Sequence, residues 1–277
     1  MIAALLLAFR EGLEAALILG IVLGILRRLG RMDQARVVWL GAGAAGLVSL
    51  AAGVGLHALG IAFEGRAEEI FEGFAMLLAA GVLTWMIFWM GRQGRAIQAD
   101  LERDVHRAVL GTRQWALFSL AFLAVLREGI ELALFLTAAA FTASAGATVI
   151  WGLVGLVAAA AAGWLLFAST RRLDVRLFFR VTSVLLIGVA AGLVAHGIHE
   201  FNEAGWIPPA VEHVWDVNPI LDEGSGVGQL VKALFGYNGN PSLTEVIGYA
   251  GYWLVVLLAQ WWGKARAGQP HPLLHQP

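Results

Sequence analysis

Two five-residue segments of the sequence place charged side chains together in a pattern that could bind a cation. Residues 10–14 read Arg-Glu-Gly-Leu-Glu, and residues 127–131 read Arg-Glu-Gly-Ile-Glu. In a helix, carboxylates at positions i and i+3 share one face, and an arginine at i lies close to a carboxylate at i+4. Each segment therefore predicts two carboxylates on one side of a helix, with an arginine able to orient them.

The four carboxylates together would form a hard, all-oxygen site, similar in ligand type to the carboxylate sites of helical di-iron proteins. Four glutamates and two arginines leave a net charge of −2, which ion pairing alone does not need and a cation would neutralise. The alternative is that the charges only form ion pairs that fix helix packing. The metal-site hypothesis takes the four glutamates as ligands and the two arginines as orienting, charge-balancing residues: Glu11, Glu14, Glu128, Glu131, Arg10 and Arg127.

The helices that carry these motifs are expected to cross a membrane. Of the 277 residues, 59% are hydrophobic and only 14% are charged, whereas a soluble protein has about 25% charged residues. This composition excludes a soluble enzyme. The net charge of −1 does not decide nucleic-acid binding, which needs a concentrated basic face, and no nucleic-acid partner is expected. A span needs about 20 apolar residues. The apolar runs predict an all-α integral membrane protein with seven transmembrane helices, at residues 2–26, 36–60, 69–90, 115–142, 149–168, 178–199 and 244–263.

The basic residues predict the orientation of these spans. Of the 19 lysines and arginines, 15 fall in the segments on one side of the predicted membrane. The positive-inside rule then places the N-terminus outside and the C-terminus in the cytoplasm. The opposite, outer side is rich in Asp and Glu, which would attract cations, although positive-inside topology by itself leaves an outer face relatively acidic.

The two motifs are 117 residues and three predicted spans apart, so the helices carrying them would run antiparallel. This spacing predicts an inverted repeat of 3+3 helices plus a seventh, with the substrate site near the midplane where the repeats meet. Gly12 and Gly129 would then allow close approach of the two motif helices. The expected organisation is a single membrane domain (1–277) with repeat one at 1–92, repeat two at 113–200, an outer loop at 200–243, the seventh span at 244–263 and a cytoplasmic tail at 264–277.

Acidic and histidine side chains gather at the predicted outer ends of the third and sixth spans. Their spacing places several of them on common helix faces, which indicates an entrance or oxidation site for a metal ion. The alternative is that they are ordinary solvated span ends. The candidate outer-entrance residues are Glu68, Glu69, Glu72, His196, His199, Glu200 and Glu203.

The doubled motif resembles that of the oxidase-dependent iron permeases, the high-affinity iron transporters of fungi and their bacterial iron-uptake counterparts. The resemblance extends over essentially the whole chain, including residues 69–73 (Glu-Ile-Phe-Glu-Gly), the Trp89–Met90 pair and residues 199–206. It implies that the four motif glutamates take part in iron passage. It also implies periplasmic partners, namely a cupredoxin-like protein and a haem peroxidase, or another oxidase.

The resulting hypothesis is a multi-pass, high-affinity iron permease of the bacterial inner membrane. It would move Fe3+, formed from Fe2+ at the outer face, through the midmembrane glutamates into the cytoplasm. Iron is the transported substrate, no permanent cofactor is expected, and the chain could form a homo-oligomer in the lipid bilayer. The alternatives are a permease for another cation such as Fe2+, Mn2+ or Pb2+, a membrane redox enzyme with an outer-face metal site, and a structural subunit of a larger complex.

Overall fold

The computed structural model describes residues 2–110, 114–142, 144–168 and 175–267, and all regular elements in these residues are helical. The predicted all-α class is therefore confirmed for the described residues. The predicted cytoplasmic tail lies outside them from residue 268 onward. The elements are α1 (Ile2–Arg28), the short 3₁₀ helix η1 (Met32–Gln34), α2 (Ala35–Ala62), α3 (Arg66–Leu110), α4 (Gln114–Phe141), α5 (Ala145–Ala168), α6 (Val175–Glu203), α7 (Gly226–Phe235) and α8 (Leu243–Ala267).

Five segments of the described chain are long and apolar enough to cross a membrane by these criteria alone: Met32–Ala62, Arg66–Met90, Ala145–Leu166, Arg180–Glu203 and Leu243–Trp262. The helices α1 and α4 have 27 and 28 residues, which is about 40 Å of helix. Each carries one arginine and two glutamates near its middle, and these charges set them apart from the five apolar helices. The fold is that of an integral membrane protein, while the count of seven spans and their orientation stay predictions.

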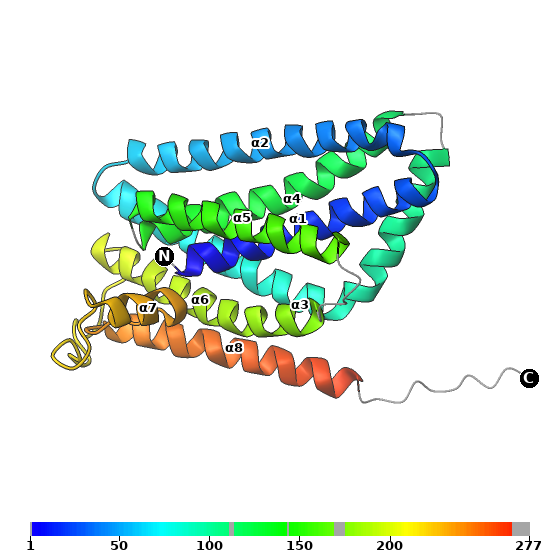
Figure 1. Ribbon diagram of the computed structural model, residues 1–277. Coiled ribbons are helices and arrows are strands. Elements are labelled where there is room, and N and C mark those ends of the chain that lie inside the picture. Colours follow the sequence, from blue (N-terminus) through cyan, green and yellow to red (C-terminus); the bar gives the residue numbers. More distant parts are fainter. Residues whose placement is uncertain (1, 111–113, 143, 169–174, 268–277) are drawn as a thin grey trace, which may run out of the picture.

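The long helices lie alongside one another, and α7 lies beside α6 (Figure 1). The main pairings join α1 to α5, α2 to α4, and α3 to α6, while α1 also contacts α4 and α8 covers α6. The two motif helices are thus in contact with each other, and each also packs on the second helix of the other half of the chain.

The motif glycines do not bring α1 and α4 together, so that expectation was wrong. A Cβ added to Gly12 would lie 2.9 Å from the Ala159 Cβ of α5, and a Cβ on Gly129 would overlap the Ser49 side chain of α2. The reason is helix periodicity: at 100° per residue, each glycine lies about 200° around the helix from the arginine two residues before it. The charged face and the close-packed face are therefore on opposite sides of each motif helix.

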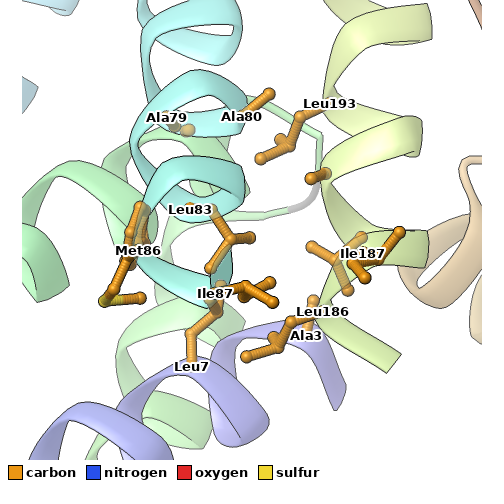
Figure 2. Packing of buried hydrophobic residues seen from close by; sticks show 14 of the residues in the cluster. Ala3, Leu7, Ala79, Ala80, Leu83, Met86, Ile87, Leu186, Ile187 and Leu193 are labelled. Atoms are coloured by element: carbon orange, nitrogen blue, oxygen red, sulfur yellow. The ribbon is translucent and has the colours of Figure 1, made fainter. Parts of the chain in front are cut away.

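An apolar core joins α1, α3, α4 and α6 next to the charged residues. Leu7 precedes Glu11 by one turn, Phe135 follows Glu131 by one turn, and both side chains are fully buried. Figure 2 shows Leu7 together with Leu83, Met86 and Ile87 of α3 and Leu186 of α6. The helices α1 and α4 are predicted to run in opposite directions, so a residue before Glu11 and a residue after Glu131 lie on the same side of the carboxylates. That side is the predicted outer one.

Candidate metal centre

Carboxylates from both motifs converge where α1 meets α4. Glu11, Glu128 and Glu131 each offer one oxygen, and these three oxygens lie within 4.8 Å of one another. All three side chains are buried. An ion with metal–oxygen distances near 2.1 Å holds neighbouring ligand oxygens roughly 3 to 4 Å apart, so a small movement would complete such a site. Within the described residues this is the one group of three or more His, Cys, Asp or Glu with that spacing.

Each arginine contacts both glutamates of its own motif, as the helical spacing predicts. Arg10 places Nη1 3.1 Å from Glu11 Oε1 and Nη2 3.2 Å from Glu14 Oε1. Arg127 donates from Nε to Glu131 Oε1 at 3.1 Å and lies 3.9 Å from Glu128 Oε1. The arginines thus neutralise part of the negative charge, and each donates a hydrogen bond to one carboxylate, Arg10 to Glu11 Oε1 and Arg127 to Glu131 Oε1.

The second oxygen of each converging carboxylate is left free. Oε2 of Glu11, of Glu128 and of Glu131 is buried and accepts no hydrogen bond. A buried polar atom without a partner costs about 1 to 3 kcal/mol, and more when the group is charged. These three oxygens belong to the carboxylates that converge, and a bound cation would satisfy them.

Glu14 lies apart from this group, although its sequence position mirrors that of Glu131. Its side chain is buried and is ion-paired with Arg10. The Glu14 carboxylate still interacts electrostatically with the carboxylates of Glu128 and Glu131. The four predicted ligands therefore divide into three converging carboxylates and one neighbour.

Three residues of α3 complete the surroundings of the arginines and were not among the predicted site residues. Met86 Sδ and Met90 Sδ accept hydrogen bonds from Arg10 Nη1 and Nη2 at 3.2 and 3.1 Å. The ring of Trp89 lies 4.6 Å from the Arg127 Cζ. The only sequence signal for them was the Trp89–Met90 pair, because apolar residues at this spacing are also typical of an ordinary packed helix face.

Five glutamates of the predicted outer entrance gather at the ends of α3 and α6. The charges of Glu68, Glu69 and Glu200 act on the Glu72 carboxylate, and Glu203 acts on Glu200. The two helix ends pack tightly here, since a Cβ on Gly73 would lie 2.6 Å from the Phe201 ring. In the described part of the chain these carboxylates do not reach the mutual spacing of metal ligands, and their role as an entrance stays a prediction.

The two predicted entrance histidines make other contacts. His199 Nδ1 lies 3.1 Å from Glu245 Oε1 of α8. His196 Nδ1 bonds the Gly192 carbonyl of its own helix at 2.9 Å. His196 also lines a cavity of about 20 Å³ with Thr142 and Lys232, which is room for about one water molecule. The structure thus joins His199 to α8 and turns His196 toward α7.

Long apolar helices around a buried carboxylate cluster define a multi-pass membrane protein of the cation-transporter class. The chain matches the model of the iron permease FTR1 family over residues 1–262, and it belongs to that family. The predicted membership is therefore confirmed, and the protein is a transporter that moves iron across the membrane rather than an enzyme.

The chain is similar to proteins named ferrous iron permease EfeU. It is 36% identical over 260 residues to the protein of Escherichia coli O6:K15:H31, covering 92% of this chain and 93% of that protein. It is 34% identical over 256 residues to that of Yersinia pestis, covering 91% of this chain and 90% of that protein. No solved structure matches the chain. Family and helical structure fit a multi-pass protein of the bacterial inner membrane.

Proposed function

We propose that iron crosses the membrane through the converging carboxylates of Glu11, Glu128 and Glu131, with Glu14 as a neighbouring acidic group. The observation that supports this most directly is the set of three buried oxygens without hydrogen-bond partners, one from each carboxylate. The two arginines reduce the charge of the four glutamates to −2, so the site attracts a cation without holding an excessive negative charge in the membrane.

The helix pairing supports the inverted repeat that this proposal includes. If α1–α3 correspond to α4–α6, the contact of α1 with α5 is equivalent to that of α4 with α2. Both contacts are present, and α3 packs on its own counterpart α6. The carboxylates then lie where the two halves meet, as in transporters built from inverted repeats.

The transported species in our proposal is Fe3+, formed from Fe2+ at the outer face. Ferric iron prefers hard oxygen ligands, and the converging ligands of the site are all carboxylates. In this scheme the acidic outer ends of α3 and α6 gather the ion. A periplasmic cupredoxin-like protein, a haem peroxidase or another oxidase supplies the oxidising step.

The second candidate is direct passage of Fe2+. It is favoured by the name of the relatives, ferrous iron permease, and by the net charge of −2, which one divalent ion neutralises. The two candidates differ in the ion that the purified protein accepts. Proteoliposomes given Fe2+ under anaerobic reducing conditions take up iron only in the second case, and those given soluble Fe3+ chelate take it up in the first.

The experiment that tests the central proposal is radioactive iron uptake by proteoliposomes containing Glu11→Gln or Glu128→Gln. Each change keeps the shape of the side chain but removes a charged ligand, so uptake should fall at least tenfold. Glu212→Gln, in the exposed outer segment, is the matched control. Unchanged uptake in both site variants would exclude this path, and Mn2+ or Pb2+ competing as well as iron would exclude iron selectivity.

The seven-span topology is testable because the chain contains no cysteine. Single-cysteine variants at Val227 and Arg31, both exposed, are proposed to lie outside and in the cytoplasm, respectively. A membrane-impermeant thiol reagent added to intact cells should label the first and spare the second. Labelling of the cysteine at position 31 would show that the orientation is the opposite of the one proposed.

A further inference from the structure

The two arginines of the site are held in different ways. The Arg10 side chain is 1% exposed and contacts two carboxylates and two thioether sulfurs. The Arg127 side chain is 37% exposed and reaches its glutamates through Nε. A long side chain at the bundle surface loses rotamer freedom when it is fixed, so Arg127 needs a contact that holds its guanidinium in place.

Trp89 provides that contact. Its ring lies under the Arg127 guanidinium, with Cζ 4.6 Å from the ring centroid. Trp85, one turn earlier on α3, stacks on Trp89, with the two ring centroids 6.0 Å apart and the ring planes tilted by 23°. A planar guanidinium on an indole face is a favourable cation–π arrangement. Arg127 is therefore held between an aromatic surface on α3 and the Glu131 carboxylate on its own helix.

We propose that Trp89 is a positioning residue for the metal site. It holds Arg127 so that Nε occupies Oε1 of Glu131 and leaves Oε2 of that carboxylate free for the transported ion. This inference rests on the proposed passage of iron through Glu131. Without the indole ring, the Arg127 guanidinium is free to move over the Glu131 carboxylate and to cover both of its oxygens, which weakens ion binding.

The expected effect is on the iron concentration for half-maximal uptake. Loss of a cation–π contact of the usual strength corresponds to a rise of about 3- to 30-fold in that concentration. Trp89→Leu should show this rise with a maximal uptake rate within about twofold of the parent. Trp89→Phe keeps an aromatic face and should recover part of the loss.

The matched control is Trp164→Leu on α5, because Trp164 is 70% exposed and lies outside both motifs. It should leave half-maximal concentration and maximal rate unchanged. Arg127→Gln supplies the second background, since Trp89 has no guanidinium to position there. In Arg127→Gln the further change Trp89→Leu should have no additional effect, as the coupling of two contacting residues requires.

Two outcomes would overturn the inference. One is a loss of maximal rate in Trp89→Leu with no change in the half-maximal concentration, which indicates a general packing role. The other is an equal effect of Trp89→Leu in the parent and in Arg127→Gln. Failure of the iron path itself is recognised separately, because Glu11→Gln and Glu128→Gln would then transport normally. If Trp89→Leu does not fold, the Trp89→Phe variant in both backgrounds gives the same comparison.

Discussion

Gly129 of α4 lies directly against Ser49 of α2, and there is no room between them for a Cβ atom. The other motif glycine, Gly12, is packed in the same way on Leu156 and Ala159 of α5. Small residues let helix backbones approach closely in membranes, where packing replaces the hydrophobic effect between helices. Through these two contacts the glycine face of each motif helix packs closely on a neighbouring helix, while its charged face points toward the metal centre.

Replacing Gly129 with alanine should destabilise the bundle and displace α4. An added methyl group in a closely packed site costs about 1 to 3 kcal/mol, and here it also moves Glu128 and Glu131. We expect a lower thermal unfolding midpoint in detergent together with weaker iron uptake. Gly46→Ala on α2, which has open space at its Cβ, should instead be neutral or slightly stabilising. Equal midpoints for the two variants would contradict the packing assigned to Gly129.

Glu14 and Glu131 occupy the same motif position, but their neutral variants should differ. Glu131 contributes an oxygen to the converging group, and Glu14 does not. Glu131→Gln should therefore raise the half-maximal iron concentration at least tenfold. For Glu14→Gln we expect only a few-fold rise, because that change removes a neighbouring charge rather than a ligand. Uptake kinetics at fixed pH measure both, and a larger effect from Glu14→Gln would place the ion elsewhere.

Loss of Arg10 should reduce stability more than loss of Arg127. Arg10→Met leaves Glu11 and Glu14 buried without their cation, and breaking a buried ion pair from one side costs about 3 to 5 kcal/mol. Arg127 is partly exposed, so its ion pairs with Glu128 and Glu131 are better screened than those of Arg10 and contribute less to stability. Thermal unfolding of the two purified variants in the same detergent compares them directly. If the thermal unfolding midpoint falls as far in Arg127→Met as in Arg10→Met, the predicted difference in stabilisation is wrong.

The attachment of α7 should weaken in acid. Partial burial raises the pKa of Glu223, but hydrogen bonds from Lys232 Nζ and the Gly239 amide lower it more, so the net pKa lies below its ordinary value of 4.5. A depressed carboxylate pKa means that the stabilisation is complete above 4.5 and is lost as pH falls through the lower folded-state pKa.

A nitroxide spin label at Val227→Cys can report this loss, because Val227 is exposed on α7. Its mobility should rise only below pH 4.5 in the parent chain. In Lys232→Met the label should already be more mobile at neutral pH, since Glu223 has lost the Lys232 ammonium and keeps only the Gly239 amide. A transition centred above pH 4.5 in the parent chain would show that another group controls α7.

Several features of the site could be predicted from the sequence because they depend only on local helix geometry. A period of 3.6 residues fixes the angle between Arg10 and Glu14 and between Arg127 and Glu131, and the structure contains both ion pairs. The same rule, applied to the glycines, could have placed them on the opposite helix face. The error was to assign Gly12 and Gly129 to the contact between the two motif helices.

Other features depend on distances between helices, which no local period encodes. One such feature is which three glutamates converge. Others are the contacts of Met86, Trp89 and Met90 with the arginines, and the separation of His196 from the outer carboxylates. In the sequence, Trp89 and Met90 look like ordinary apolar residues of a span. They gain a specific role only because α3 packs where both arginines can reach it.

The sequence by itself determined that this protein is helical, apolar and charged at two repeated positions, because composition and helical periodicity are local properties. The tertiary structure decided which of those charges meet, which oxygens stay free and what holds each arginine. The physical reason is that close packing of small residues between helices sets the rotation and depth of every helix. A rotation of one helix by a single residue would turn the glutamates of its motif away from those of the other.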